Sequence, residues 1–490
     1  MNLTLLPVLS ALSNQGVQKK PIKRVAIVGA GIAGLSLAHA LENSKEDLEV
    51  SIFDSRKALD FTVGSGVQLN GGLSILGKIN KSVQKSVMEA GVPISDIRGK
   101  NKSWFSDTST DMLWNYSIEK LIRDAGGAAE KELIQDDKVL WCGITRGALQ
   151  ETLFETLPKN DQMTVEFDKA LVGIESGAVC KFADGSTRGP FDVIVGADGV
   201  KSAVKEYIER GEISKDPSKR EGSAAAIYSG IRIGYAVQDG KSLEERKKKV
   251  AVEQTFADGA YIFSGTFGNG EKRPPCNCAF IISLDENYNG PFKRKTTPQN
   301  MAAAENSDWS QDNKMTTEEV RTQMLQRMEA TRVANENTVQ TVSDADRFFD
   351  LGVYFHNPIS LMGWSKEIPS STGAFAVLCG DAAHAMPPFL GQGANQGIQD
   401  AFCLSRKIET YNSRVMTEDN LELKTLLKEY EKARWSPTAS ITAKAAILGY
   451  LETGGRNGFY SKFRDAFFKT LALLRIPVKV LLDAATPKVE

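Results

Sequence analysis

The sequence is poor in the residues that bind metal ions or build disulfide frameworks. Six of its 490 residues are cysteine and three are histidine. The cysteines show no CxxC spacing, which a zinc site of the finger or ribbon type requires, and they are predicted to be free thiols in a reducing compartment. Three histidines argue against a histidine-rich metal centre, although a carboxylate site remains open. No metal site is predicted, and catalysis is expected to depend on an organic cofactor.

The sequence has neither an excess of one charge nor a long apolar run. It contains 60 Lys and Arg against 61 Asp and Glu, a net charge of -1. A nucleic-acid-binding domain usually carries a basic excess, so that class of protein is not indicated. No run of about 18 apolar residues is present, so no transmembrane helix is predicted. Residues 1–13 are mostly apolar without a basic start, and we interpret residues 1–20 as an N-terminal tail or a weak targeting segment.

Residues 24–54 have the pattern of a βαβ unit. The apolar run 25–28 is typical of a parallel strand that is buried on both faces, and Leu35, Ala38 and Leu41 suit a helix packed on it. A polar turn then leads into a second strand. The fold class is therefore predicted to be α/β with a parallel sheet.

A GxGxxG motif lies between the first strand and the helix. In such a turn Gly29 permits the tight bend, Gly31 lets the backbone approach a pyrophosphate, and Gly34 lets the helix lie close to the strand. The amino end of the helix, at Ile32, then faces the phosphate charge. Asp54 ends the second strand, where an acidic side chain accepts hydrogen bonds from adenosine ribose hydroxyls. This unit predicts a dinucleotide site without separating NAD from FAD, and a glycine turn without a ligand is its structural alternative.

The middle of the chain has the features of a second, antiparallel sheet. Strand-like stretches occur at 225–236, 250–256, 260–267 and 278–284. Between 291 and 337 the composition is polar, but Thr316 and Glu319 form a capping box. Met324 and Met328 follow four residues apart. An amphipathic helix is therefore predicted inside a loop-rich insertion of a substrate domain.

Two later segments carry a family resemblance. Residues 192–202 read DVIVGADGVKS, a buried strand that ends in a glycine and acid turn, and residues 378–400 read LCGDAAHAMPPFLGQGANQGIQD. The glycine fingerprint, this DG segment and this GD segment, in this order and widely separated, resemble the class A, or para-hydroxybenzoate hydroxylase-type, FAD-dependent monooxygenases. The resemblance extends over about residues 23–434, and the GD segment is its most specific part.

The resemblance implies roles for residues of the GD segment. Asp381 is expected to bind the ribityl chain of FAD, since a carboxylate accepts hydrogen bonds from sugar-like hydroxyls; an ordinary turn acid is the alternative. The next loop leads into a helix whose amide groups are expected to stabilise negative charge on reduced flavin. The residues of this loop are Gly391, Gln392, Gly393, Ala394 and Asn395. Pro387 and Pro388 are expected to stiffen the strip beside the flavin ring.

Other cofactor contacts are implied outside the GD segment. Similar proteins place the equivalent of Arg146 at the FAD phosphate and ribityl region, with a surface salt bridge as its alternative role. Asp198 and Gly199 are implied in positioning FAD and nicotinamide, and Arg56 in flanking the adenosine. His384 is interpreted as structural. The predicted cofactor is FAD, with NADPH or NADH as a co-substrate that binds transiently, because no second glycine fingerprint is present.

The predicted architecture is a Rossmann-like FAD-binding domain with a parallel sheet, interleaved with an antiparallel-sheet substrate domain and followed by C-terminal helices. The FAD-binding domain takes residues 21–215 and 345–410, and the substrate domain with its polar insertion takes 216–344. Residues 411–490 form the C-terminal helical extension.

Within this extension an apolar periodicity predicts a helix that ends before Pro477. The periodic residues are Phe463, Phe467, Leu471 and Leu474. Packing in the core is the default interpretation. The alternative is a membrane-surface helix whose cations face lipid headgroups. These cations are Lys462, Arg464, Lys469 and Arg475.

The resemblance implies that the protein is a monooxygenase. In the expected cycle NAD(P)H reduces FAD, the reduced flavin reacts with O2 to give a C4a-hydroperoxide, and one oxygen atom hydroxylates or epoxidises an organic substrate. The cofactor supplies the difficult chemistry, so no catalytic residue of the chain is named.

Two finer likenesses leave the substrate open. The segments VQLN at 67–70, YSG at 228–230 and the stretch 347–364 are similar to zeaxanthin epoxidases and to salicylate hydroxylase-like proteins. The first likeness implies a lipophilic polyene and a plastid membrane surface. The second implies a phenol or another aromatic acid and is compatible with a cytoplasmic enzyme.

Three other classes of protein compete with this prediction. A flavin oxidase or dehydrogenase would use the same site without inserting oxygen. A flavin-dependent halogenase shares the glycine fingerprint, but residues 364–369 read WSKEIP, where Lys366 replaces the second tryptophan of the halogenase signature. A non-enzymatic escort protein of related fold would use the scaffold to bind a protein partner, and the intact GD segment argues against it.

Overall fold

The structure is a computed structural model that describes most of the chain. The described residues are 20–42, 47–102, 110–216, 224–247, 250–257, 259–285, 316–331, 336–359, 363–371, 373–417, 421–453 and 458–489. Apart from Lys20, the predicted N-terminal segment 1–20 lies outside the described residues, as does most of the polar insertion.

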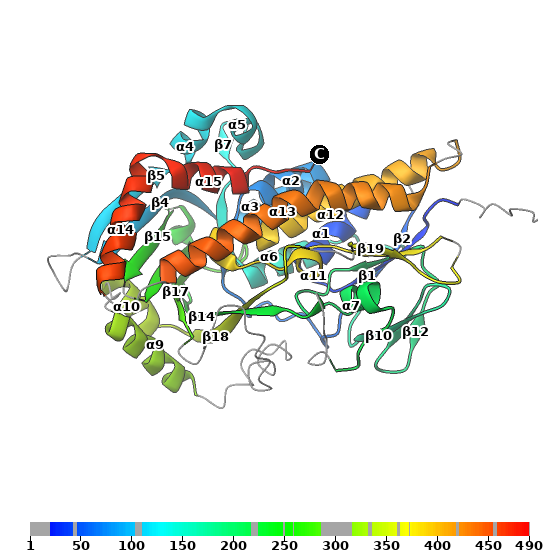
Figure 1. Cartoon of the computed structure of the whole chain (residues 1–490), viewed down its shortest axis with the longest axis horizontal. Helices are drawn as coiled ribbons and strands as arrows, with labels where there is room; N and C mark the ends of the chain where they lie inside the picture. The colour runs from blue at the N-terminus through cyan, green and yellow to red at the C-terminus, as the bar shows by residue number, and fades with distance from the viewer. Residues whose placement is uncertain are drawn as a thin grey trace, which may run out of the picture.

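Six strands form the first sheet, in the order β19–β20–β13–β1–β2–β9. All neighbours are parallel except β19, which is antiparallel to β20. The strands are β1 Arg24–Val28, β2 Glu49–Phe53, β9 Met163–Glu166, β13 Val193–Gly196, β19 Ser365–Glu367 and β20 Phe375–Leu378. The apolar run of β1 is buried because α1 (Ile32–Glu42) and α12 (Gly393–Arg414) cover one face of the sheet and α7 (Ala203–Arg210) the other (Figure 1). The predicted βαβ unit and parallel sheet are confirmed.

A second, larger sheet is mainly antiparallel. Its strands are β3 Gly66–Leu69, β4 Val92–Lys102, β5 Thr110–Ser117, β8 Cys142–Thr145, β14 Ile227–Gln238, β15 Val250–Ala257, β16 Ala260–Phe267, β17 Cys276–Leu284 and β18 Arg347–Phe355. They follow the order β18–β14–β17–β16–β15–β4–β8–β3, with β5 beside β4. The four strand-like stretches in the middle of the sequence are therefore confirmed as β14 to β17.

The second sheet takes strands from both sides of the middle region. Strands β3, β4, β5 and β8 precede residue 216, and β18 follows residue 344. Within the described part of the chain, its one parallel strand pair joins β4 to β15, where Ile97 lies opposite Val252. The two sheets thus interleave more closely along the chain than a substrate unit of 216–344 implies. The domain boundaries themselves stay a prediction.

Smaller elements complete the fold. Two small sheets consist of β10 Leu171–Glu175, β11 Val179–Phe182 and β12 Thr187–Arg188, and of β6 Ile134–Gln135 with β7 Lys138–Val139. The other helices are α2 Gly71–Ile79, α3 Lys81–Ala90, α4 Ile118–Ala125, α5 Gly127–Leu133, α6 Arg146–Glu155, α9 Thr317–Thr331, α10 Glu336–Ser343, α11 Asp381–His384, α13 Leu423–Thr453, α14 Gly458–Leu473 and α15 Ile476–Ala485. Two 3-10 turns are η3 Leu243–Lys247 and η4 Pro388–Leu390.

The predicted capping box begins α9. The Thr316 amide donates to Glu319 Oε2 at 2.6 Å, and the Glu319 amide donates to Thr316 Oγ1 at 3.3 Å. Met324 and Met328 are buried against the second sheet, as the four-residue spacing predicts. The amphipathic helix is therefore confirmed.

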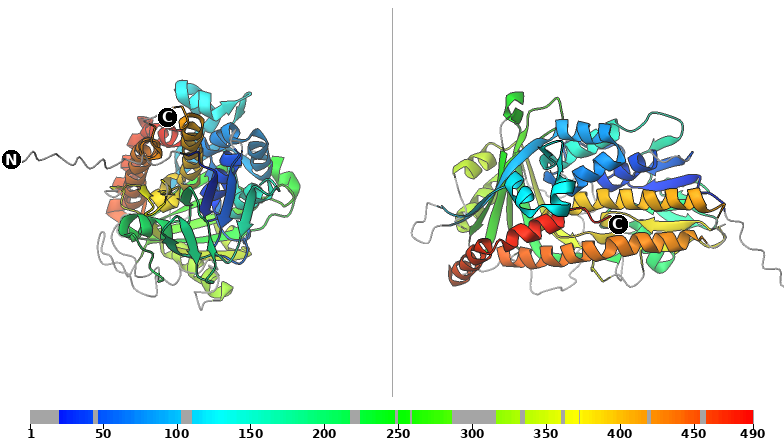
Figure 2. Two further views of the ribbon diagram at one scale, coloured as in Figure 1. Left: turned by 90° about the vertical axis from the view of Figure 1, so that its right-hand side faces the viewer. Right: turned by 90° about the horizontal axis from the view of Figure 1, so that it is seen from above.

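Helices α12 and α13 run side by side across the molecule (Figure 2). Helix α13 contacts β19 of the first sheet and β16 and β17 of the second. Leu404 and Ile408 of α12 and Leu427 and Tyr430 of α13 are fully buried. One continuous helix thereby links the two sheets and reaches the region between them.

The C-terminal helix corrects one prediction. Helix α14 ends at Leu473, before Pro477 as predicted, and Pro477 is the second residue of α15. The side chains of Phe463 and Phe467 are exposed by 64% and 39%, whereas Arg464 is buried. Core packing of the apolar stripe is therefore wrong, and Arg464 does not face outward. Helix α14 packs a polar and aromatic face against β5 instead. Amphipathic spacing alone does not reveal which face of a helix packs against the protein.

The cysteines follow the prediction made for them. All six are free and buried. Among the described residues, no helix combines the length and the apolar character needed to cross a membrane.

Candidate active site

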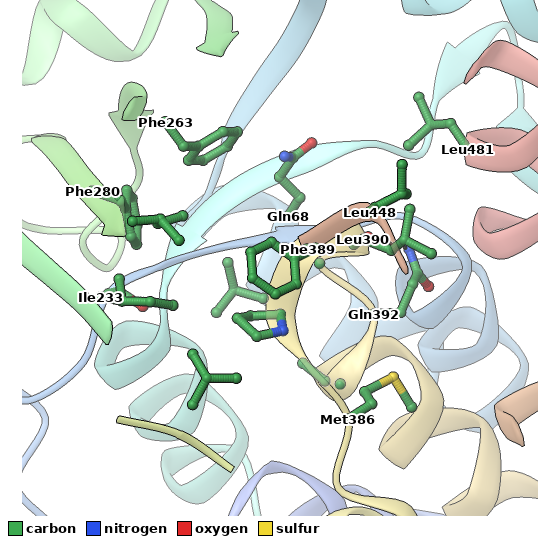
Figure 3. Close-up of a pocket in the computed structure, with 18 of the residues that line it drawn as sticks. Gln68, Ile233, Phe263, Phe280, Met386, Phe389, Leu390, Gln392, Leu448 and Leu481 are labelled. Carbon is green, nitrogen blue, oxygen red and sulfur yellow. Dashed lines mark hydrogen bonds between the residues drawn. The ribbon is translucent and has the colours of Figure 1, made fainter. Parts of the chain in front are cut away.

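A cavity of about 730 Å³ lies between the glycine turn of the first sheet and the face of the second sheet. One end is formed by the turn after β1, the GD segment and the start of α12. The other end is formed by the second sheet and by α13, α14 and α15. In Figure 3, Phe263 and Phe280 of the sheet lie opposite Leu448 of α13 and Leu481 of α15, with Phe389 between them.

The glycine turn has the close approaches that a dinucleotide site requires. Gly29 has a φ of +107°, and a Cβ atom there would lie 2.4 Å from the Ala197 carbonyl oxygen. A Cβ atom on Gly34 would lie 2.0 Å from the Gly29 carbonyl oxygen. At Gly31 the nearest atom to a Cβ would be 3.9 Å away, so this glycine borders open space. Backbone closes the turn at Gly29, where Ala197 of the DG segment lies close, and at Gly34, where the turn meets itself, while Gly31 stays open, which fits an approaching pyrophosphate.

Asp54 lies beside this turn and is occupied by protein contacts. Its Oδ2 accepts a hydrogen bond from the Ala30 amide at 2.8 Å, and its Oδ1 accepts from Arg56 Nε at 2.8 Å. Burial alone would raise the pKa of Asp54, but the hydrogen bonds and charge of Arg56 lower it overall. Asp54 and Arg56 do not line the cavity, so their predicted contact with adenosine stays a prediction.

Arg146 and Asp381 bring opposite charges into the cavity wall. Arg146 is the first residue of α6, and its amide donates to the Ser65 carbonyl at 2.8 Å. Burial raises the pKa of Asp381, an effect that His384 and Arg146 oppose. Burial lowers the pKa of Arg146 overall, and the negative charges of Asp381 and Asp54 oppose this shift. A group with both phosphate and hydroxyls fits this pair, because the guanidinium matches anions and the carboxylate accepts from hydroxyls.

The amino end of α12 opens into the same cavity. Gly391, Gly393 and Ala394 line the cavity, and no side chain caps the first turn of α12. The amides of this turn are therefore available to negative charge. The Asn395 side chain holds the loop in place, since its Oδ1 accepts from the Asn70 and Gly72 amides at 3.0 and 2.9 Å. Any cofactor contact of Asn395 is left to its backbone.

The remaining predicted residues fall into two groups. Ile32, Gly199 and Pro388 line the cavity. Pro387 and Asp198 do not line the cavity. Pro387 is buried next to Pro388, and Asp198 Oδ2 accepts a hydrogen bond from the Ala203 amide at the start of α7 at 2.7 Å. The structure thus brings the glycine turn, Arg146, the GD segment and α12 to one cavity end, while their contacts with FAD stay predictions.

His384 belongs to a buried polar network behind the GD segment. Its Nε2 lies 2.5 Å from Asp400 Oδ2, which also accepts from the Gly380 amide at 2.8 Å. Arg434 Nε donates to Asp400 Oδ1 at 2.7 Å. His384 does not line the cavity, so it positions the segment rather than meeting a substrate.

The C-terminal helices supply cavity residues that sequence reasoning missed. Leu448 and Glu452 of α13, Phe468 of α14 and Leu481 of α15 all line the cavity. Glu452 stands in an apolar stretch, AAILGYLET, on the buried face of α13. An acidic residue in such surroundings was the one available signal, since buried acids need a partner or a function.

Comparisons with known proteins agree with this site. The family model "FAD binding domain" matches residues 374–439, and "NAD(P)-binding Rossmann-like domain" matches residues 27–81. Salicylate hydroxylase of Pseudomonas putida is 25% identical over 422 residues, which cover 85% of this chain and 82% of that protein. Aurachin C monooxygenase/isomerase of Stigmatella aurantiaca is 23% identical over 457 residues, covering 93% and 96%.

Solved structures share the fold. Klebsiella pneumoniae HpxO complexed with FAD and uric acid has a TM-score of 0.67 and 16% identity, covering 95% of this chain and 97% of that one. A salicylate hydroxylase substrate complex has a TM-score of 0.61 and 17% identity, covering 95% and 98%. The chain shares its fold with class A flavin monooxygenases, and its family matches mark an FAD-dependent flavoprotein. It is an FAD-dependent monooxygenase similar to enzymes of the salicylate hydroxylase type, and its Rossmann-like match fits NAD(P)H as co-substrate.

Replacement of Gly31 should separate folding from FAD binding. Gly31→Val places its side chain in open space, so the protein should fold but retain FAD poorly. Gly34→Val is the matched control in the same turn, and it should fail to fold because its Cβ would meet the Gly29 carbonyl oxygen at 2.0 Å. The FAD-to-protein ratio and the melting temperature of each purified variant measure these effects. A Gly31→Val protein with normal FAD affinity would show that the motif does not hold the pyrophosphate.

Loss of Arg434 should destabilise the protein strongly. Arg434→Met leaves the fully buried Asp400 without its guanidinium partner, a change that costs about 3–5 kcal/mol. Lys407→Met is the matched control, because Lys407 joins the same two helices through an exposed pair with Glu429, worth about 1 kcal/mol or less. Denaturant unfolding of both variants measures the difference. Equal effects of the two substitutions would contradict the importance of the buried pair.

The same network should make stability depend on acid pH. Burial alone would raise the pKa of Asp400, but His384 and Arg434 lower it overall. A carboxyl with a lowered pKa in the folded state stabilises the fold above its unfolded pKa, and this contribution is lost as the pH falls through the folded value. The difference in stability between Arg434→Met and the parent protein should therefore shrink toward acid pH.

Proposed function

We propose that this FAD-dependent monooxygenase oxygenates an uncharged, lipophilic substrate. The observation that carries the proposal is the composition of the cavity wall. Away from the GD segment, this wall is formed mainly by aromatic and aliphatic side chains of the second sheet and the C-terminal helices. Such a wall removes apolar surface from water and favours an apolar ligand.

The few charged groups of the wall support the same substrate class. Among the described residues that line the cavity, the charged side chains are Arg146, Asp381, Lys444 and Glu452. Arg146 and Asp381 lie at the end predicted to hold FAD. Lys444 is paired with Asp483 at 2.8 Å. Among the described lining residues, the wall away from the cofactor end therefore offers a carboxylate substrate no cation without a partner, and the loss of its hydration would cost several kcal/mol.

The cofactor and the protein divide the work. FAD, when bound, supplies the redox chemistry with NAD(P)H and O2. The open space at Gly31 would receive the pyrophosphate of FAD, and Asp381 would accept hydrogen bonds from the ribityl hydroxyls. The amides at the start of α12 would stabilise negative charge on the flavin. The wall itself excludes water from the reacting end of the substrate, and within it Phe389 of the GD segment lies against Tyr261 of the second sheet. No acid or base is assigned.

Of the two substrate classes that the sequence leaves open, this wall favours the lipophilic polyene over the aromatic acid. The likeness to zeaxanthin epoxidases points in the same direction. The relatives carry the names of different substrates although they share one fold. We therefore infer the substrate from the cavity wall and not from the family.

Oxygenation with labelled dioxygen tests the proposal. The FAD-loaded protein, NADPH and ¹⁸O₂ are incubated with xanthophylls and with hydroxybenzoates, and the products are analysed by mass spectrometry. We expect one labelled oxygen atom in a lipophilic product, with the second oxygen atom reduced to water at the expense of NADPH. Labelled hydroxybenzoate alone would overturn the substrate class. A product without label would indicate an oxidase or dehydrogenase, and a protein that binds no FAD would indicate the escort class.

We further propose that the surface around the cavity mouth docks on an anionic lipid bilayer. Ile447 and Ile476 line the cavity and are also exposed, by 61% and 37%, so they form its mouth. Phe463, Leu473 and Leu474 continue this exposed apolar surface along α14. The cations Lys462 and Lys469 of α14, Arg475 between α14 and α15, and Lys479 of α15 are exposed. This combination suits a bilayer, whose core takes the apolar groups while its headgroups pair with the cations. A lipophilic substrate would then enter without crossing water.

Vesicle binding tests the docking surface. The FAD-loaded protein should co-sediment with phosphatidylglycerol vesicles, and the double variant Phe463→Ser and Leu473→Ser should bind several times less. Met416→Ser is the matched control, because Met416 is 72% exposed but lies after α12, away from the cavity mouth. Equal binding of the double variant and the control would exclude this surface as the contact. An unchanged melting temperature in both shows that their fold is intact.

A further inference from the structure

Glu452 is a buried acid in the apolar part of the cavity. It lies near the C-terminal end of α13, is 5% exposed, and lines the cavity. Its Oε2 atom is buried and has no hydrogen-bond partner among the described residues. A buried polar atom without a partner costs free energy, so this atom marks a place where a ligand group is missing.

The surroundings of Glu452 position its carboxyl group. The Tyr261 hydroxyl of β16 donates a hydrogen bond to it. Arg464 of α14 approaches from the other side and donates to the Glu452 backbone carbonyl at 3.2 Å. The guanidinium of Arg464 is paired with Asp465 at 2.9 Å. Glu452 is therefore held by Tyr261, while the charge of Arg464 is largely balanced by its own neighbour.

These contacts decide the protonation of Glu452. Burial raises its pKa to about 8, although the Tyr261 hydrogen bond and the Arg464 charge lower it. The carboxyl group is thus mainly protonated at neutral pH. One oxygen then accepts from Tyr261, and the other carries a hydrogen that the cavity can use as a donor.

We propose that Glu452, held by Tyr261, binds an oxygen atom of an otherwise apolar and uncharged substrate. The oxygen belongs to a hydroxyl, ether or carbonyl group, which accepts the hydrogen bond that Oε2 cannot make within the protein. The inference rests on the proposed function, because it specifies the substrate of the same cavity. We assign Glu452 to orienting the substrate; Tyr261 beside it packs against Phe389 of the GD segment, with ring centroids 6.2 Å apart. A pure hydrocarbon would leave the donor unmatched and bind less well.

A matched pair of probes tests this contact. 4-Heptylphenol and heptylbenzene differ in one hydroxyl group, and their dissociation constants for the FAD-loaded protein are measured by equilibrium dialysis. We expect the phenol to bind about tenfold more tightly, the effect of one hydrogen bond that replaces an unmatched donor. Glu452→Leu should abolish this preference, whereas Glu452→Gln should retain most of it because the amide still donates. Equal affinity of the parent protein for both probes would overturn the inference.

A control variant separates the hydrogen bond from the shape of the cavity. Leu448 lies one helical turn before Glu452 and lines the same wall. Leu448→Val should weaken both probes by the same factor and leave their ratio unchanged. Melting temperature and FAD content show whether each variant is folded. A ratio that changes in Leu448→Val but not in Glu452→Leu would assign the preference to shape and reject the contact.

The pH dependence gives a second and independent test. 4-Heptylanisole can accept a hydrogen bond but cannot donate one, so it needs the protonated form of Glu452. Its preference over heptylbenzene should fall as the pH rises from 7 to 9 through the pKa of about 8. The groups that face Glu452 are Tyr261 from β16 and Arg464, with Asp465, from α14. Glu452→Gln should remove the pH dependence, and a dependence that persists in this variant would contradict the role of Glu452.

The two proposals can fail separately. Labelled oxygen in a lipophilic product, together with a phenol preference that survives in Glu452→Leu, would overturn this inference and leave the proposed function intact. A preference that follows Glu452, without labelled product from any lipophilic compound, would support the binding site and overturn the proposed reaction.

Discussion

The buried carboxylate of Asp400 holds together the segments that form one end of the cavity. It belongs to α12 and accepts hydrogen bonds from the Gly380 amide, from His384 and from Arg434 of α13. Arg434 also donates to the Lys488 carbonyl near the end of the chain. A fully buried charge is tolerated only when its partners are all in place, so the GD segment, α12 and α13 are positioned together. The cofactor end of the cavity depends on this network.

Helix α13 extends the influence of this network to the substrate end. Arg434 and Glu452 lie on the same helix, 18 positions apart, which corresponds to about 27 Å. Arg434 therefore fixes the middle of α13 behind the GD segment, and the C-terminal end of the helix carries the polar group of the apolar wall. Helix α13 also contacts both sheets. This single helix therefore sets the distance between Arg434 behind the GD segment and Glu452 in the apolar wall. This arrangement gives the C-terminal extension a part in the site rather than a peripheral position.

Local chemistry made the first part of the fold predictable. The turn at Gly29 and Asp54 directly after the second strand lie within one short stretch, and Gly29 and Gly34 have a steric reason visible in the structure. The pairing of β4 with β15 was out of reach, because Ile97 and Val252 meet only through tertiary folding. The apolar spacing of α14 was misleading for a related reason. Periodicity identifies an apolar face such as that of Phe463 but does not say whether protein, lipid or water covers it.

The candidate site shows the same division between local and tertiary information. Asp381 was recognised from its motif, whereas Glu452 belongs to no motif and is defined only by burial and by Tyr261 from a distant strand. Flavin enzymes of one fold share the cofactor end because the cofactor chemistry is shared, so their specificity has to reside in the opposite wall. Here that wall contains one hydrogen-bonding acid among apolar side chains and a mouth beside exposed apolar helices. A charged aromatic acid gains little from such a wall, while a lipophilic molecule with a single oxygen atom matches both of its properties.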